Sequence, residues 1–279
     1  MRPPEPSRIV AARAGVAVYE RGTGHPVLLV GGFPDHAIGL LPLAESLAAA
    51  GFRAIVAAYP GYAPSEPLPD DDYSIPAVAG DLLTVMDALD APRFSIVGHG
   101  WGALYGYLMA SLHPDRIDRL VGIAAPHPAG FGRRHRLYAE QKTVVYAYLL
   151  AYASIAEELA MNREWLTSLA HDWSPGLWRA DWTAVLDLVA TPEAARATHR
   201  YYRADMEGRG PATGRVAPPT TVIYGTQSRC IRPALFGGLD GLFDAPLHQH
   251  AIEDVGHWPH LERPETVVPL IVAGLRRTA

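Results

Sequence analysis

The sequence predicts an α/β fold built on a mostly parallel sheet and interrupted by a helical insertion. Short apolar runs at residues 26–30 and 54–59 alternate with segments that have helical spacing. Runs of this kind are typical of strands that are buried on both faces of a parallel sheet. The alternation stops after residue 126 and resumes at Thr221, and the residues between have helical character with no clear strand. This pattern predicts helices inserted into a sheet domain.

The individual elements follow from local patterns. Residues 8–21 alternate around Val10, Val16 and Val18, which predicts a β-hairpin at a sheet edge. Further strands are predicted at 26–30, 54–59, 94–97, 120–125, 221–224 and 247–252, and helices at 40–50, 74–89, 103–111 and 264–277. We therefore predict a core domain from residues 1–126 and 216–279, with a helical cap at 127–215.

Composition narrows the function classes. The chain has 279 residues, of which 49% are apolar, so it can bury a large single core. Its net charge of −5 gives no reason to expect a nucleic-acid partner. The single cysteine, Cys230, excludes an intrachain disulfide and a multi-cysteine zinc site. No apolar run is long enough for a signal peptide or a membrane span. We expect a cytoplasmic monomer or homodimer that acts on a small molecule, without a metal, a cofactor or a membrane.

One motif indicates the site. The predicted strand 94–97 leads into Gly98-His99-Gly100-Trp101-Gly102, and a helix follows. A G-x-x-x-G pattern between a strand and a helix is typical of a nucleophile elbow, which holds its central residue at the top of the sheet. The helix N-terminus then points at any anion bound there. The central residue is Gly100, which has no side chain to attack a substrate.

These motifs resemble the epoxide-hydrolase and haloalkane-dehalogenase branch of the α/β-hydrolase superfamily over nearly the whole chain. The elbow of that branch usually reads G-H-D-W-G with an aspartate nucleophile, so the resemblance places Gly100 at the nucleophile position. Residues 31–36 resemble its H-G-F-P oxyanion loop, with Gly31 in place of the histidine. Residues 256–264 resemble the segment of its catalytic histidine, which makes His257 the general base. The resemblance implies an α/β-hydrolase fold, with an eight-stranded, mostly parallel twisted sheet flanked by helices and an inserted helical cap.

The acid position also departs from the branch. Its pattern G-x-x-D appears here as Gly-Thr-Gln-Ser at 225–228, so Ser228 stands where the aspartate is expected. A serine can accept a hydrogen bond from the ring of His257, but it adds no negative charge to stabilise an imidazolium. The resemblance also implies that the backbone N–H groups of Phe33 and Trp101 form an oxyanion hole.

Further side chains are candidates for substrate binding. Members of this branch use two cap tyrosines to activate the epoxide oxygen, and Tyr202 with Tyr146 or Tyr148 fits that role. Asp35 is also a candidate substitute acid. For each of these side chains the alternative is a structural role in packing or capping. The full set of expected substrate-binding residues is Phe33, Trp101, Gly32, Asp35, His36, His127, Tyr146, Tyr148, Tyr202 and Trp258.

The functional prediction is a hydrolase-like enzyme without a covalent nucleophile. His257 and the oxyanion loop would catalyse cyclisation, elimination, isomerisation or direct hydrolysis of a small apolar substrate, in a biosynthetic pathway. Three alternatives remain: an epoxide hydrolase-like enzyme inactivated at Gly100, naturally or by engineering; a non-catalytic protein that binds a ligand; and a structural subunit.

Overall fold

A single eight-stranded sheet forms the centre of the molecule. The computed structural model describes residues 4–133, 142–177, 182–208 and 212–276. The strand order is β1-β2-β4-β3-β5-β6-β7-β8; β2 pairs antiparallel with β1 and with β4, and every other pair is parallel. The predicted fold class is therefore confirmed. The strands are β1 (Arg8–Ala11), β2 (Gly15–Arg21), β3 (His25–Val30), β4 (Phe52–Ala57), β5 (Phe94–His99), β6 (Ile117–Ile123), β7 (Thr220–Gly225) and β8 (Leu247–Ile252).

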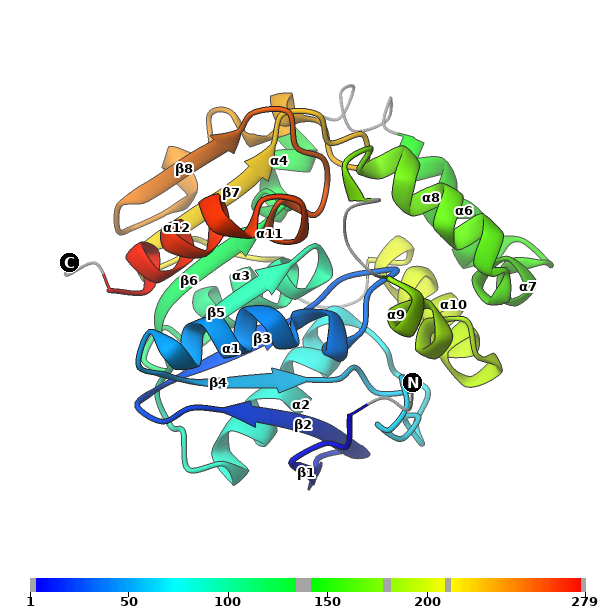
Figure 1. Cartoon of the computed structure of the whole chain (residues 1–279), viewed down its shortest axis with the longest axis horizontal. Helices are drawn as coiled ribbons and strands as arrows, with labels where there is room; N and C mark the ends of the chain where they lie inside the picture. The colour runs from blue at the N-terminus through cyan, green and yellow to red at the C-terminus, as the bar shows by residue number, and fades with distance from the viewer. Residues whose placement is uncertain (1–3, 134–141, 178–181, 209–211, 277–279) are drawn as a thin grey trace.

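Helices cover both faces of the sheet (Figure 1). Two helices pack on one face, α1 (Leu41–Ala49) and α12 (Pro264–Arg276), and two on the other, α2 (Ile75–Ala88) and α3 (Trp101–Leu112). Strand β3 shows why its sequence is continuously apolar. Successive side chains point to opposite faces, so Leu29 joins the core under α1 while Leu28 joins the core under α2 and α3.

Most predicted core elements match the observed ones within two or three residues. The hairpin at 8–21 forms as β1 and β2. The largest differences are at the starts of elements. Strand β6 begins at Ile117 rather than at 120, and α3 begins at Trp101 rather than at 103. The earlier start of α3 follows from the sharp turn at Gly100, which places the next residue directly in the first helical turn.

The segment between β6 and β7 is helical. No strand occurs among the described residues between these two elements, apart from one isolated bridge between Val216 and Phe243. The inserted helices lie beyond the carboxyl ends of the strands (Figure 1). They are α4 (Pro128–Arg133), α6 (Lys142–Tyr152), α7 (Ala156–Met161), α8 (Arg163–Trp173), α9 (Thr183–Val189) and α10 (Pro192–Met206). The short helices elsewhere are η1 (Ala37–Leu40), η3 (Pro233–Phe236), η4 (Asp240–Leu242) and α11 (Pro259–Glu262).

The inner face of helix α10 contacts the sheet domain. Thr191 caps its N-terminus, where the side chain accepts a hydrogen bond from the N–H of Ala194 at 3.2 Å. Tyr201 and Tyr202 are buried on its inner side, and the Tyr201 hydroxyl donates to the carbonyl of Pro60 at 3.1 Å. This contact fixes the inner face of α10 over the ends of the strands. Within the described residues, no helix is long and apolar enough to cross a membrane.

The N-terminus of α3 packs directly against the backbone at the end of β3. The N–H of Gly102 donates to the carbonyl of Gly31 at 2.8 Å. A Cβ added at Gly102 would lie 2.0 Å from the carbonyl oxygen of Val30. Only glycine permits this approach, because both the obstructing atom and its neighbours belong to the backbone. The spacing of the elbow glycines is therefore a packing requirement.

We predict opposite effects of the same substitution at two helical glycines. Gly102→Ala should lower the free energy of unfolding by about 3 kcal/mol, because β3 and α3 must move apart. Gly80→Ala is the matched control. Gly80 is exposed in α2 with nothing within 4 Å of an added Cβ, so alanine should raise stability by about 0.5–1 kcal/mol. Urea denaturation measures both values, and equal effects would contradict this account of the elbow.

Candidate active site

Gly100 forms the sharp turn between β5 and α3. Its φ of 56° and ψ of −117° lie in a region that side-chain-bearing residues rarely adopt. Its N–H donates to the carbonyl of Ile123 at 3.0 Å, which holds the turn at the end of the sheet. A Cβ added here would meet two atoms within 4 Å: the Cα of Gly32 at 3.4 Å and Nε2 of His257 at 3.9 Å. The space beside Gly100 therefore opens toward the imidazole of His257.

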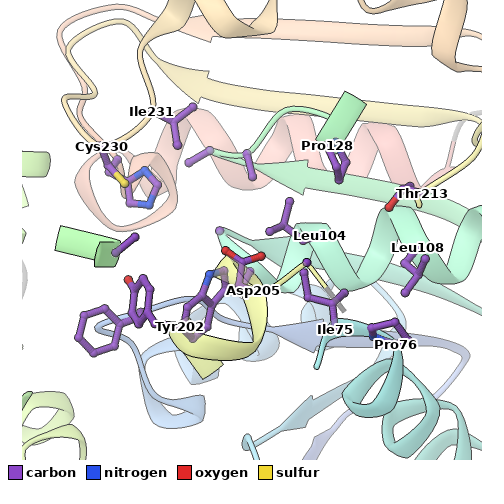
Figure 2. A pocket seen from close by; sticks show the side chains of 18 of the residues that line it. Ile75, Pro76, Leu104, Leu108, Pro128, Tyr202, Asp205, Thr213, Cys230 and Ile231 are labelled. Carbon is purple, nitrogen blue, oxygen red and sulfur yellow. The ribbon is translucent and has the colours of Figure 1, made fainter. Parts of the chain in front are cut away.

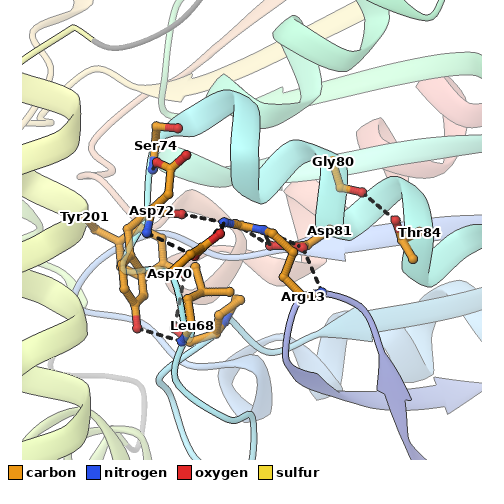
Figure 3. Close-up of polar contacts among 11 residues, drawn as sticks. Arg13, Leu68, Asp70, Asp72, Ser74, Gly80, Asp81, Thr84 and Tyr201 are labelled. Atoms are coloured by element: carbon orange, nitrogen blue, oxygen red, sulfur yellow. Dashed lines mark hydrogen bonds and ion pairs between the residues drawn. The ribbon is translucent and has the colours of Figure 1, made fainter.

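A cavity of about 380 Å³ lies over this turn. Five residues expected from the sequence line it: Phe33, Gly100, Trp101, Tyr202 and His257. Figure 2 shows Cys230 and Tyr202 at one end of the pocket, and Leu108, Pro76 and Thr213 at the other. Its volume suits a small organic molecule.

Backbone contacts on both sides hold His257. Its N–H donates to the carbonyl of Trp173 at the end of α8, at 3.2 Å, and its own carbonyl accepts from Nε2 of His99 at 3.0 Å. The ring is buried and packs edge-on against Trp173, with centroids 5.6 Å apart. Burial, with the nearby imidazoles of His99 and His260, lowers the pKa of His257 well below its ordinary value. The imidazole is therefore neutral at neutral pH.

Ser228, which was expected at the acid position, makes no hydrogen bond with Nδ1 of this imidazole. Nδ1 of His257 has no hydrogen-bond partner among the described residues. The Oγ of Ser228 instead accepts from the N–H of Ile231 at 3.4 Å. The orientation of the loop comes from the carbonyl of Trp173, which also accepts the N–H of Arg229 at 3.3 Å. One carbonyl of the inserted helices thus accepts hydrogen bonds from both the loop of His257 and the loop of Arg229.

A buried carboxylate reinforces the same junction. Glu262 of α11 accepts hydrogen bonds from the N–H of Gly256, at 2.9 Å, and from the hydroxyl of Ser174. The Oγ of Ser174 in turn accepts from the N–H of Trp258 at 3.1 Å. The residues before and after His257 are therefore both anchored to Ser174 and Glu262. Charge-assisted bonds of this kind are among the stronger ones in proteins.

The oxyanion donors expected from the sequence remain available. The backbone N–H groups of Phe33 and Trp101 donate to no described residue. Both residues line the pocket, and the N–H of Trp101 belongs to the first turn of α3, whose dipole favours negative charge. Their side chains also form one aromatic wall with Tyr202, at centroid distances of 5.4 Å from Phe33 and 4.6 Å from Trp101.

Comparison with known proteins places this site in a family. The model of the α/β hydrolase fold family matches residues 25–264. The chain belongs to the α/β-hydrolase fold family. It is 26% identical to an epoxide hydrolase of Caballeronia sordidicola, over 93% of this chain and 90% of that protein. It is 23% identical to bifunctional epoxide hydrolase 2 of Rattus norvegicus, over 96% of this chain but only 55% of the rat protein.

Solved structures share the fold of this α/β-hydrolase. The Bacillus megaterium epoxide hydrolase in complex with an inhibitor superposes with a TM-score of 0.82 at 21% identity, covering 97% of this chain and all of that one (100%). A variant of the Solanum tuberosum epoxide hydrolase gives 0.79, also at 21% identity, with 97% and 99% coverage. At this identity the likeness concerns the fold.

Beneath the pocket of this α/β-hydrolase lies a buried polar cluster of Asp35, His99 and His260. Their metal-ligating atoms lie within 4.8 Å of one another, the one such group among the residues that the structure describes. Nε2 of His99 donates to the carbonyl of His257, so Nδ1 of the same ring carries a lone pair. This Nδ1 lies 3.8 Å from Oδ2 of Asp35. Burial raises the pKa of Asp35 to about 7 and lowers that of His99 to about 4. A proton on Asp35 removes the repulsion between the two acceptors, so the geometry requires no ion.

Asp35 also occupies the space left by Gly31. A Cβ added at Gly31 would lie 3.3 Å from Oδ2 of Asp35. In the resemblance described above, a histidine stands at this position. The glycine at 31 and the carboxylate at 35 are therefore sterically complementary, and Asp35 fills space within this loop rather than lining the pocket.

Several other candidates lie outside the described lining of the pocket. The ring of His36 bridges the carbonyl of Ala63 and the N–H of Ile38, and that of His127 bridges the carbonyl of Gly214 and the N–H of Ala129, so both hold loops in place. Each of the remaining candidates makes a different contact. Tyr146 donates a hydrogen bond to Asp172 at 3.4 Å, and Tyr148 is 59% exposed and packs on Tyr152. Trp258 is buried against Trp173 and Trp182. Gly32 lies under the turn at Gly100.

Sequence patterns did not reveal some residues of the pocket. Leu104 and Leu108 line it one turn apart on α3, and Trp173 reaches it from α8. Asp205 of α10 is the most consequential addition, because burial raises the pKa of its carboxyl to about 6. Its spacing was a usable signal, since Asp205 follows Tyr202 by three residues and so lies on the same face of the helix.

We predict that Asp35→Asn flattens the dependence of stability on pH. The raised pKa means that the folded state holds a proton which the unfolded state releases near pH 4. The ionisation of Asp35 therefore lowers the free energy of unfolding as pH rises from about 4 to 7, by a total on the order of 4 kcal/mol. Asparagine cannot ionise, and its amide can donate toward His99.

The measurement is the free energy of unfolding of both proteins across this pH range. The difference between variant and wild type should grow in favour of the variant as pH rises. Asp115→Asn, at an exposed carboxylate, is the matched control. A difference for Asp35→Asn that stays constant from pH 4 to 8 would contradict the assignment.

Proposed function

We propose that this α/β-hydrolase family member is an enzyme that catalyses non-covalent acid/base chemistry on a small, largely apolar substrate. The observation that carries the proposal is the space beside Gly100, whose added Cβ would lie 3.9 Å from Nε2 of His257. The resemblance described above implies a nucleophilic side chain at this position. Here a water molecule or a substrate group fits there, within reach of a proton acceptor.

The neutral imidazole of His257 acts as the base. Its lowered pKa keeps a lone pair available at neutral pH but makes the base weak, so the proton that it removes must be acidified. The free N–H groups of Phe33 and Trp101 supply that activation, because they stabilise negative charge as it develops on an oxygen. Proton removal next to a carbonyl fits this combination best. It is the first step of enolisation, and of many isomerisations, eliminations and cyclisations.

Covalent hydrolysis fits this site less well. Gly100 offers no atom that could form an ester intermediate. Nδ1 of His257 has no carboxylate partner among the described residues, so the imidazolium is unsupported in either route. The non-covalent route differs in needing no nucleophile at position 100, because the N–H groups of Phe33 and Trp101 would stabilise the charge that develops on the substrate. A biosynthetic transformation of a reactive substrate is the setting in which such a site suffices.

We expect the protein to accelerate hydrogen exchange next to a ketone. Acetophenone in D₂O is a suitable probe, because it is small and apolar and its exchange is followed by NMR. His257→Gln should reduce the protein-dependent rate by about 10²-fold or more, since the general base is removed. His113→Gln, at an exposed site at the end of α3, is the control and should leave the rate unchanged. Exchange at the wild-type rate in His257→Gln would overturn the proposal.

Restoring a carboxylate at the turn separates this proposal from a merely inactivated hydrolase. Gly100→Asp has room for its Cβ, although its positive φ should cost about 1–2 kcal/mol of stability. We expect no sustained turnover of styrene oxide by this variant, because His257 still lacks a carboxylate partner. Multiple turnovers, measured as diol formed per enzyme, would instead favour an epoxide hydrolase that has lost only its nucleophile.

A further inference from the structure

The pocket has an apolar lining with a single carboxylate. Among the lining residues that the structure describes, Asp205 carries the only acidic group, and no lysine or arginine lies with it. Most of the others are aliphatic or aromatic, such as Leu104, Leu108 and Trp101. A carboxylate in such surroundings is costly unless a partner compensates its charge.

The fold directs this carboxylate into the pocket. Asp205 lies one helical turn after Tyr202 on α10, and both side chains line the cavity. In Figure 2 the carboxylate of Asp205 lies between the end marked by Tyr202 and Cys230 and the end marked by Leu108 and Thr213. A ligand that extends from the space beside Gly100 along α3 therefore passes Asp205 midway.

Within the described part of the chain, the charge of this carboxylate is uncompensated. No described residue donates a hydrogen bond to the carboxylate of Asp205 or forms an ion pair with it. Arg203, the nearest described cation in sequence, instead pairs with Glu207 at 3.0 Å on the exposed side of α10. Although burial raises the pKa of Asp205 to about 6, the group remains mainly ionised at neutral pH. Among the described lining residues, the pocket therefore holds a carboxylate without a paired cation.

Aromatic rings of the same pocket also suit a cation. The rings of Trp101 and Tyr202 pack at a tilted angle of 59° with centroids 4.6 Å apart, and Phe33 meets Tyr202 edge-on. The faces of such rings attract positively charged nitrogen, and the attraction is strongest where water is excluded. A carboxylate together with aromatic faces is a combination suited to binding an ammonium group.

We propose that the substrate of this pocket carries a positively charged nitrogen, which pairs with Asp205 while apolar groups of the substrate fill both ends of the cavity. This inference rests on the proposed function for the reacting end, since it assigns the recognition of the substrate that His257 deprotonates. Asp205 would select amines over neutral molecules of the same shape.

Binding of matched probes tests the inference without turnover. 4-Phenylbutylamine and 4-phenylbutanol have the same apolar body and differ in charge. Calorimetry at pH 8 should give an affinity at least about 10-fold higher for the amine, as expected for a charge-assisted hydrogen bond. Asp205→Asn should abolish this preference while it retains affinity for the alcohol. Glu207→Gln, at the exposed carboxylate two residues along α10, should retain the preference.

The outcomes distinguish this inference from the proposed function. Equal affinity for both probes in the wild type would overturn the inference, as would a preference that persists in Asp205→Asn. A third outcome would also overturn the inference: no amine preference in the wild type, together with a large loss of exchange activity in Asp205→Asn. That result would make Asp205 a proton-transfer group instead. His257→Gln should keep the amine preference. The binding test therefore stays valid even if the exchange measurement shows that His257 is not the base.

Discussion

The close contact between the start of α3 and the end of β3 determines the rest of this site. Gly102 lies so near the carbonyl of Val30 that the helix must begin immediately after the turn at Gly100. That position points the first helical N–H groups toward the end of the sheet. The direction of the Trp101 N–H and the path of α3 along the pocket both follow from this one steric condition.

The two parts of the pocket to which we assign functions are supported in different ways. The proposed reacting end rests on backbone groups: the N–H of Trp101, the N–H of Phe33 and the carbonyl of Trp173 that holds the loop of His257. The proposed recognition of an amine depends on one side chain, Asp205, from an inserted helix. A family that keeps its sheet constant can therefore change substrate by changing the inserted helices, while the hydrogen-bonding groups at the turn stay in place.

Local patterns were sufficient for the sheet, the turn and the loops beside it. The glycines around Gly100 and the segment around His257 each form one short continuous motif, and their proximity follows from the order of the strands. Asp205 and Trp173 were missed because their roles depend on how separate helices pack over the sheet. The cluster of Asp35, His99 and His260 was also hidden, because its members come from three segments that meet only in the folded chain. His36 and His127 hold loops through hydrogen bonds of their rings. A single histidine in a sequence does not reveal whether it will hold a loop in this way or bind a ligand.

The carbonyl of Trp173 is shared by two loops, since it accepts from both His257 and Arg229. Because Trp173 ends α8, any motion that lifts this end of the inserted helices also removes the support of the imidazole. Ser174, the next residue, adds a second connection through Glu262 to the residues that flank His257. On the proposed function, lifting of this end of α8 would therefore weaken the closure of the pocket and the support of its base together.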